Sequence, residues 1–348
     1  MGKVLGIIGE YNPFHNGHLY HIEQSKKLTG ANYTVAIISG NFMQRGSTAI
    51  MDKWSRAETA LRNGIDLVIE LPVLFALSSA ENFCDGAIKI LNELKVVDYL
   101  SFGAETSDID ILKDIADIFY QEPREYKAFL ANELKKGVSF PKARENALSI
   151  FLRQENNPNT AKYLSAISAP NNILGIEYIK ALKKYKSKIK PVSIARFEAG
   201  YNDKKIHNNI ASATAIRNII KNNNFDVLPK LLPETSLSIL LKNIKEGRAV
   251  PDLSVFEKQI IYNLRKMTIA EIAELADVSE GLENLLKNSA NSCNNLFDLL
   301  DSIKSKRYTL TRLQRIMLYL LLGITKKDIS ISKKTTPYVR DLGFNERG

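Results

Sequence analysis

Short, almost continuous apolar runs recur along the N-terminal part of the chain. They are rich in β-branched side chains and occupy residues 3–11, 33–40, 66–72, 97–103 and 189–197. Runs of this length without polar alternation are typical of strands that are covered on both faces, as in a parallel sheet. The pattern therefore predicts a buried sheet.

Between the first four of these runs, the apolar positions follow a helical period instead. The segments are GHLYHIEQSKKL (17–28), KWSRAETALRNG (53–64) and NFCDGAIKILNEL (82–94). Strands and helices that alternate in this way predict a doubly wound, Rossmann-like α/β fold with a parallel sheet. Ligands of such folds bind beyond the carboxyl ends of the strands, so the turns that follow the strands are the places to look for chemistry.

The pattern changes twice farther along the chain. Residues 122–165 are charged, helical in pattern and poor in strand signal, which indicates a helical insertion. From about residue 225 onward the segments are all helical, and prolines punctuate the start of this region. We therefore expect an α/β domain of residues 1–222, which carries the insertion, and a helical C-terminal domain of residues 223–348.

Composition narrows the class of protein. The longest apolar run, residues 316–324, is far shorter than the ~20 residues of a membrane span, and no signal-peptide pattern follows Met1. We therefore expect a cytoplasmic protein with no membrane partner. Cys84 and Cys293 lie far apart with no histidine near either, which indicates neither a disulfide nor a metal site. The formal net charge of +10 favours a polyanionic partner such as nucleic acid.

Three of the four histidines of the chain lie where the first strand passes through a turn into a helix, in GIIGEYNPFHNGHLYH (6–21). The first amides of a helix are unpaired and its dipole is positive at that end, so such a turn attracts phosphate. Asn16 is expected to cap the helix, and Gly17 leaves room for a ring or a phosphate to approach the backbone. His15 and His18 are expected to donate to one phosphate group.

Imidazole suits chemistry at phosphorus, because it donates a hydrogen bond when neutral and adds positive charge as negative charge accumulates. Phosphoryl and nucleotidyl transfer need little else beyond positioning, with Mg²⁺ on the phosphates. The alternative is that His15 and His18 are ordinary turn residues. His21 is expected to be a plain residue of the helix surface or the core.

The turn resembles the H-x-G-H signature of the nucleotidyltransferase superfamily, which includes the class I aminoacyl-tRNA synthetases. In that superfamily the histidines hold the triphosphate of ATP and the glycine lies against the adenine. The segment IASATAIRNII (210–220) resembles its second motif, S-S-T-x-I-R. The resemblance implies that Ser212, Thr214 and Arg217 close over the β and γ phosphates, although Ala213 removes one hydroxyl of the motif. A helix start with hydroxyl caps is the alternative.

Seven collinear blocks extend the resemblance over nearly the whole chain: EYNPFHNGHLYH, SGNFMQRG, DLVIELP, FGAET, PNNILGIEYIKAL, IASATAIR and KRYTLTRLQR. In this order they resemble the bacterial tRNA(Met) cytidine acetate ligases. That family implies activation of acetate by ATP to acetyl-adenylate, and transfer of the acetyl group to N4 of the wobble cytidine of elongator tRNA(Met). The expected partners are ATP, acetate and this tRNA.

The same resemblance implies which residues form the site. His15 and His18 are the expected catalytic residues. The expected ATP-binding residues are Ile7, Ile8, Gly9, Glu10, Tyr11, Asn12, Pro13, Phe14, His15, Asn16, Gly17, His18, Leu19, Tyr20, Gly103, Asn171, Arg196, Phe197, Ser212, Thr214 and Arg217. Asn171 either bonds the nucleoside or caps a helix. Arg45, after the second strand, is a candidate clamp for a carboxylate or a phosphate, because its planar fork suits either.

A basic segment lies near the C-terminal end of the sequence. Between residues 302 and 327 no acidic residue occurs, and we expect tRNA contacts from Lys304, Lys306, Arg307, Arg312 and Arg315. Such a surface can follow a phosphate backbone while an aromatic side chain, here Tyr308, stacks on an unpaired base. The alternative is a solvated helix face.

Two alternative functions stay open. A small-molecule adenylyltransferase of cofactor synthesis predicts the same ATP site, but it gives no reason for a basic helical domain. An RNA-binding protein in which the ATP fold is a relic has no need to keep both motifs together.

Overall fold

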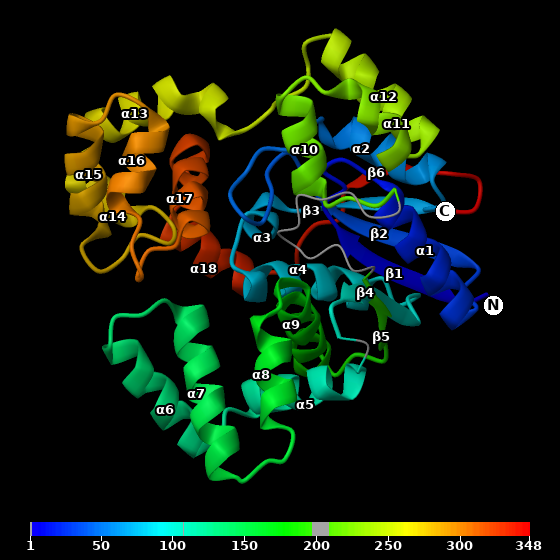
Figure 1. Ribbon diagram of the computed structural model, residues 1–348, viewed down its shortest axis with the longest axis horizontal. Coiled ribbons are helices and arrows are strands. Elements are labelled where there is room, and N and C mark those ends of the chain that lie inside the picture. Colours follow the sequence, from blue (N-terminus) through cyan, green and yellow to red (C-terminus); the bar gives the residue numbers. More distant parts are fainter. Residues whose placement is uncertain (1, 107, 197–208) are drawn as a thin grey trace.

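The computed structural model of the chain describes residues 2–106, 108–196 and 209–348. At its centre is a sheet with the strand order β5-β4-β1-β2-β3-β6 (Figure 1). The strands are β1 (Val4–Gly9), β2 (Tyr33–Ser39), β3 (Leu67–Leu71), β4 (Tyr99–Ala104), β5 (Lys190–Ala195) and β6 (Asp341–Phe344). Neighbours among β1 to β5 run parallel, and β6 runs antiparallel to β3. The predicted doubly wound sheet is confirmed, with one antiparallel strand added at its edge.

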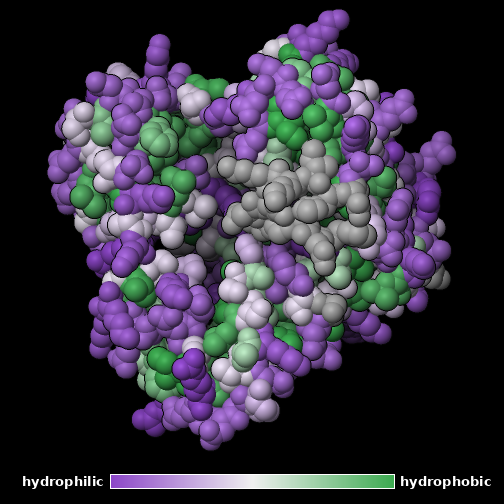
Figure 2. All heavy atoms as spheres, in the orientation of Figure 1, coloured by the Kyte–Doolittle hydropathy of each residue, from purple (hydrophilic) through white to green (hydrophobic). Residues whose placement is uncertain are grey.

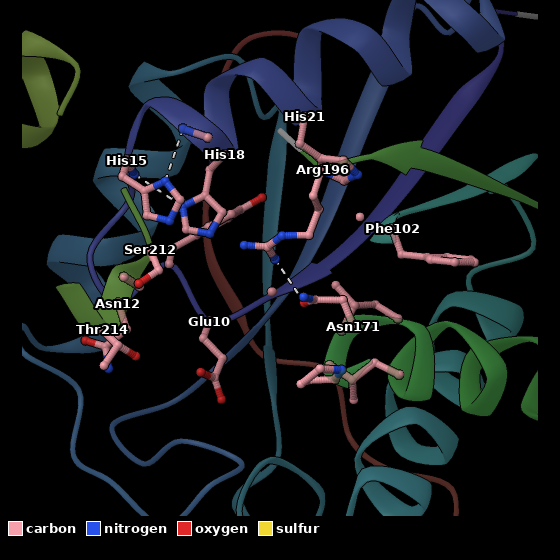
Figure 3. A pocket seen from close by; sticks show the side chains of 18 of the residues that line it. Glu10, Asn12, His15, His18, His21, Phe102, Asn171, Arg196, Ser212 and Thr214 are labelled. Carbon is pink, nitrogen blue, oxygen red and sulfur yellow. Dashed lines mark hydrogen bonds between the residues drawn. The ribbon is translucent and has the colours of Figure 1, made fainter. Parts of the chain in front are cut away.

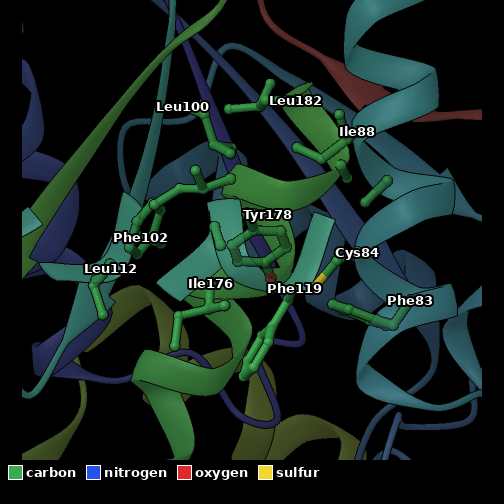
Figure 4. Packing of buried hydrophobic residues seen from close by; sticks show 14 of the residues in the cluster. Phe83, Cys84, Ile88, Leu100, Phe102, Leu112, Phe119, Ile176, Tyr178 and Leu182 are labelled. Atoms are coloured by element: carbon green, nitrogen blue, oxygen red, sulfur yellow. The ribbon is translucent and has the colours of Figure 1, made fainter. Parts of the chain in front are cut away.

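Helices cover both faces of this sheet, which explains why its strands are apolar throughout. On one face lie α1 (Asn16–Thr29) and α2 (Lys53–Arg62), and on the other lie α4 (Ala80–Glu93), α5 (Ile109–Gln121) and α9 (Pro170–Lys184). Leu5 and Ile7 of β1 are buried on the first face, whereas Ile8 packs toward the second. Figure 4 shows the second face, where a Cβ at Gly175 of α9 would lie 2.6 Å from the Phe102 ring, so only glycine fits there.

Three further helices extend the second face away from the sheet (Figure 1). They are α6 (Arg124–Lys135), α7 (Phe140–Gln154) and α8 (Thr160–Ser168), in the segment where an insertion is expected. Tyr126, Leu148 and Tyr163 of these helices are buried in the same cluster as residues of α4 and α9. The segment therefore enlarges an existing core and does not build one of its own.

The chain after residue 209 supplies two more groups of helices. In the first group, α10 (Ala213–Lys221), α11 (Leu228–Leu231) and α12 (Glu234–Lys245) bury apolar side chains against Ile50 and Met51. The second group packs around another core, which also includes Leu77, and consists of α13 (Glu257–Lys266), α14 (Ile269–Glu274), α15 (Leu282–Ser292), α16 (Leu296–Ile303), α17 (Leu310–Leu322) and α18 (Lys326–Lys334). Short elements complete the description: α3 (Val73–Ala76), η1 (Phe225–Val227) and η2 (Leu253–Phe256). The domain limit at residue 222 stays a prediction, since α10 packs with helices that lie beyond it.

The strand β6 differs from the all-helical C-terminal region that we expected. It pairs with residues 67–69 of β3. Arg340, just before β6, lies 3.2 Å from the carboxylate of Glu70 at the end of β3, and Lys53 lies 2.7 Å from the same carboxylate. The group α13 to α18 is thus enclosed, along the chain, between two segments that contact the α/β part.

Candidate active site

A cavity of about 530 Å³ opens at the carboxyl ends of the strands, a volume within the usual range for ligand sites. The ends of β1, β4 and β5 and the starts of α1, α9 and α10 line it, as Figure 3 shows in part. In the space-filling view, mostly hydrophilic side chains surround a recess between α13–α17 and α6–α8 (Figure 2). The site lies where a doubly wound sheet is expected to bind its ligand.

The backbone at the start of α1 fixes the tautomers of His15 and His18. The amide of Gly17 donates to Nδ1 of His15 at 3.1 Å, and the amide of His15 donates to Nδ1 of His18 at 3.2 Å. A neutral imidazole that accepts at Nδ1 carries its proton on Nε2. The two rings stack with 3.8 Å between centroids and 27° between their planes, so the pair presents two neighbouring Nε2–H donors.

His15 is itself the N-cap of α1, and the prediction that Asn16 caps this helix is wrong. The Asn16 amide instead donates to the backbone oxygens of Asn209 and Lys230, at 3.1 and 2.9 Å. An N-cap at Asn16 would accept from the amide of His18 or Leu19, but both of these amides already donate to the backbone oxygen of His15, at 2.8 and 3.2 Å.

Burial keeps the histidines neutral. It lowers the pKa of His15 to about 3, with further lowering by the charges of Arg196 and Arg217. Burial also sets the pKa of His18 well below its usual value, with His15 and Arg196 adding to the effect. Neutral donors beside two guanidinium groups are suited to receive a polyanion, whose charge would offset the local positive potential.

The third histidine also belongs to the site, which the sequence interpretation missed. His21 lines the cavity, and its Nε2 lies 3.0 Å from Oγ of Ser101. The spacing indicates that His21 lies near the other two histidines, because positions 15, 18 and 21 are three apart and so share one side of a helix over two turns. Burial, followed by the charge of Arg196, lowers the pKa of His21 to about 4.

His21→Gln is expected to flatten the dependence of stability on pH. The pKa of His21 in the folded protein lies below the ordinary histidine value of 6.5, so the unfolded chain takes up the proton first as the pH falls. The stabilising contribution is complete above about pH 6.5 and is lost toward pH 4, with a slope of about 1.4 kcal/mol per pH unit for one group. Urea unfolding at several pH values between 7 and 4.5 measures the free energy of unfolding and its slope against pH. Parallel curves for the variant and the original protein would contradict the assignment.

The second motif closes one side of the cavity. Ser212 caps α10 by accepting from the amide of Ala215 at 3.1 Å. The Arg217 guanidinium donates to Oγ1 of Thr214 at 3.1 Å and to the backbone oxygen of Asn12 at 2.8 Å. The structure thus brings the segment 210–217 against the turn that carries the histidines, so that both helix starts face one space.

On the other side, Asn171 joins two parts of the site. Arg196 donates to Oδ1 of Asn171 at 2.9 Å, and Nδ2 of Asn171 donates to Glu105 at 2.5 Å. The Glu105 carboxylate also accepts from the amides of Asn171 and Asn172, at 3.3 and 3.0 Å. Glu105, not Asn171, therefore satisfies the start of α9. Glu105 was not predicted, because a carboxylate sixty-odd residues upstream gives no local capping signal.

Most of the expected ATP-binding residues line the cavity, and a few do not. Those that line it are Ile7, Ile8, Gly9, Glu10, Tyr11, Asn12, His15, Gly17, His18, Tyr20, Gly103, Asn171, Arg196, Ser212, Thr214 and Arg217, with Arg45. Pro13, Phe14, Asn16 and Leu19 are not among the lining residues, and Phe14 is fully buried in the core under α1. Phe197 lies outside the described residues. Lining residues that were not predicted include Gln44, Phe83, Phe102, Leu174 and Tyr178.

The helix α17 forms part of the wall, which the sequence did not predict. Its residues Thr311 and Gln314 line the cavity. The loop after β2 comes so close that a Cβ at Gly46, which has φ +78°, would lie 2.5 Å from the backbone nitrogen of Arg315. The hydroxyl of Tyr319 donates to the backbone oxygen of Leu77 at 2.5 Å. The second helical group therefore contacts the site directly.

The buried Arg56 of α2 forms hydrogen bonds with the backbone at the ends of two strands. Its guanidinium donates to the backbone oxygens of Glu10 at 2.6 Å and Met51 at 3.2 Å, and to those of Ser39 and Gly40 after β2. The side chain is fully buried, and burial lowers its pKa to about 10. The guanidinium thus connects the end of β1 with the end of β2. It therefore fixes the strand ends that support the turn with His15 and His18.

The basic segment is only partly available to a partner. Arg315 is 9% exposed and lies 2.9 Å from the carboxylate of Asp277, and Arg312 donates to the backbone oxygen of Asp277 at 2.8 Å. Arg307 pairs with Glu280 at 2.7 Å. The interpretation of Tyr308 as a stacking platform is wrong, because the ring is 6% exposed and its hydroxyl donates to a backbone oxygen. Lys304 and Lys306 are exposed.

Two kinds of feature are absent from the described part of the chain. Within it, no group of three or more His, Cys, Asp or Glu side chains is arranged to hold a metal ion. None of its helices combines the length and the apolar character that crossing a bilayer requires.

Comparison with known proteins agrees with this geometry. Residues 2–348 match the family described as HIGH Nucleotidyl Transferase. The tRNA(Met) cytidine acetate ligase of Acetivibrio thermocellus is 47% identical over 99% of this chain and 84% of its own length, and that of Halothermothrix orenii is 43% identical over 99% and 82%. The crystal structure of Thermotoga maritima TmcAL bound with alpha-thio ATP superposes with a TM-score of 0.93 at 39% identity, and covers 99% of this chain and 81% of that one. The chain therefore belongs to the tRNA(Met) cytidine acetate ligase family of HIGH nucleotidyl transferases.

Proposed function

We propose that this protein, in the cytoplasm, uses ATP to convert acetate to acetyl-adenylate with release of pyrophosphate. It then transfers the acetyl group to N4 of the wobble cytidine of elongator tRNA(Met). One observation carries the proposal most directly: the paired Nε2–H donors of His15 and His18 face the same cavity as the start of α10. This is an arrangement for stabilising charge that develops on a phosphate chain.

The reaction requires that the protein position acetate and ATP, and it requires no nucleophile from the protein. An acetate oxygen attacks the α-phosphorus, and pyrophosphate leaves toward the donors of α1 and α10. The Nε2–H groups bind the phosphate oxygens where negative charge increases, and Arg217 lies beside them through its bond to the backbone of Asn12. Mg²⁺ bound to the ATP phosphates would neutralise part of their charge.

The nucleoside is expected on the opposite side of the cavity. Gly103 ends β4, and a Cβ there would already touch the Arg196 side chain at 3.3 Å, so its absence leaves space for a ring. Asn171 and Arg196 present an amide and a guanidinium to that space. The Thermotoga maritima TmcAL structure was solved with an ATP analogue, which supports ATP as the ligand of this protein.

Incubation of the protein with ATP, labelled acetate and total tRNA tests the function, followed by digestion of the RNA and a search for N4-acetylcytidine. AMP and pyrophosphate are the expected nucleotide products. Acetylation from acetyl-coenzyme A without ATP, or ADP as the product, would contradict the proposal. The small-molecule adenylyltransferase and the relic are not favoured, because close relatives are named as tRNA ligases and the ATP motifs meet in one cavity.

Alanine at both Lys304 and Lys306 is expected to weaken tRNA binding and to flatten its dependence on salt. These side chains are exposed at the end of α16, whereas Arg312 and Arg315 are held by Asp277. Each lost phosphate contact reduces the slope of log K against log salt by about 0.7 to 0.9. Filter binding at several salt concentrations measures the slope. A double variant of Lys242 and Lys245, which are exposed on α12, is the matched control and should keep the original slope.

A further inference from the structure

Glu10 is the one acidic side chain among the described residues that line the cavity. It follows β1 directly, and its position is fixed at two points. Its backbone oxygen accepts from Arg56 at 2.6 Å, and Oε1 accepts from the amide of Gln44 at 2.8 Å. Figure 3 shows its carboxylate directed away from His15 and His18. The carboxylate is therefore held in place within the cavity.

The resemblance counts Glu10 within the ATP-binding segment, but its carboxylate repels the phosphates and so gives them no favourable contact. Activation of acetate has no use for it either, since the attacking group is another carboxylate. The second half of the reaction is different. An exocyclic amine that attacks an acyl carbonyl must lose a proton, and it forms its best hydrogen bond with a carboxylate.

The histidines are not placed to take that proton. Nδ1 of His15 and Nδ1 of His18 already accept backbone amides, and their Nε2 atoms carry hydrogen. Protonation of either ring at Nδ1 would break the cap of α1. The Nε2 of His21 is engaged with Ser101.

We propose that Glu10 accepts the proton of the cytidine amine during acetyl transfer. The inference rests on the proposed function and assigns a residue to its second step. The N4 lone pair forms a bond with the acetyl carbonyl carbon, and the bond from that carbon to the phosphate oxygen breaks, so AMP leaves with the electron pair. The N4 proton passes to the Glu10 carboxylate and from there to water.

Glu10→Gln separates the two half-reactions. Glutamine keeps the shape and the acceptor for the Gln44 amide, but it does not take up a proton. Hydroxylamine traps acetyl-adenylate as acetohydroxamate without help from a base, because it is already a strong neutral nucleophile. We expect the variant to lose acetylation of tRNA at least a hundredfold more than it loses formation of acetohydroxamate from ATP and acetate, as is usual for loss of a general base.

Glu105→Gln is the matched control. Glu105 holds Asn171 and the start of α9, so its loss is expected to reduce both rates together. If Glu10→Gln likewise reduces both rates in proportion, or neither, or if its loss of acetylation is matched by loss of tRNA binding, the assignment of Glu10 is wrong. If the original protein forms no acetohydroxamate from ATP and acetate, the proposed function itself fails.

Discussion

Replacing His18 with alanine is expected to slow acetate-dependent release of pyrophosphate about a hundredfold, while the affinity for tRNA stays unchanged. The ring presents an Nε2–H donor whose orientation is fixed by the amide of His15. Loss of one such donor to a developing charge typically costs about 3 kcal/mol of transition-state stabilisation. Pyrophosphate release with saturating ATP measures the rate, and filter binding measures the affinity.

His18→Asn is the control that separates catalysis from capping. The Asn carboxamide oxygen can take the place of Nδ1 and accept from the His15 amide, but no donor remains at the position of Nε2. The asparagine variant should therefore be as stable as the original protein and as slow as the alanine variant. Normal pyrophosphate release in both variants would remove His18 from the mechanism.

Replacing Arg56 with methionine is expected to lower the free energy of unfolding by about 4 kcal/mol. Methionine fills much of the same volume, but it leaves the oxygens of Glu10, Ser39, Gly40 and Met51 without their donor. A buried polar group that loses its partner costs about 1 to 3 kcal/mol, and partial hydration of four oxygens reduces their sum. Urea unfolding at pH 7 measures the change.

Arg62 on the same helix provides the comparison for Arg56. It is exposed and pairs with Glu58 at 2.9 Å, an i,i+4 contact that contributes only about 0.3 to 0.5 kcal/mol. Arg62→Met should therefore change stability by less than about 1 kcal/mol. Equal effects of the two substitutions would show that the bonds of Arg56 to the strand ends contribute nothing specific.

The central part of the fold was predictable because it is encoded locally. The apolar runs at 3–11 and 33–40 are covered on both faces, and short β-branched runs of this length are typical of such strands. The strand β6 was not predictable, since four residues with one buried side chain carry no periodic signal. Only the free edge of β3 makes that segment a strand.

The candidate site likewise has one part that is encoded locally and another part that depends on tertiary contacts. The turn with His15 and His18 is readable from adjacent residues, because strand end, glycine and helix start follow one another in the sequence. Arg312, Arg315 and Tyr308 belong to a run that reads as a solvated basic face. Asp277 and Glu280, some thirty residues upstream, turn part of it into tertiary structure. Such pairs depend on how helices pack, which no local pattern contains.

The return of the chain to the sheet at β6 limits how the helices α13 to α18 move. On the side that precedes them, Asn243 of α12 bonds Ser55 of α2 at 3.2 Å, and on the side that follows, β6 pairs with β3. A helical group that is attached to the α/β part at one point can rotate about three axes. A group that is attached at two points can rotate only about the line that joins them. The distance between the surface around Lys304 and the histidines is then restricted. If that surface binds tRNA as proposed, we expect the protein to select RNAs whose target base lies at a matching distance from the bound phosphates.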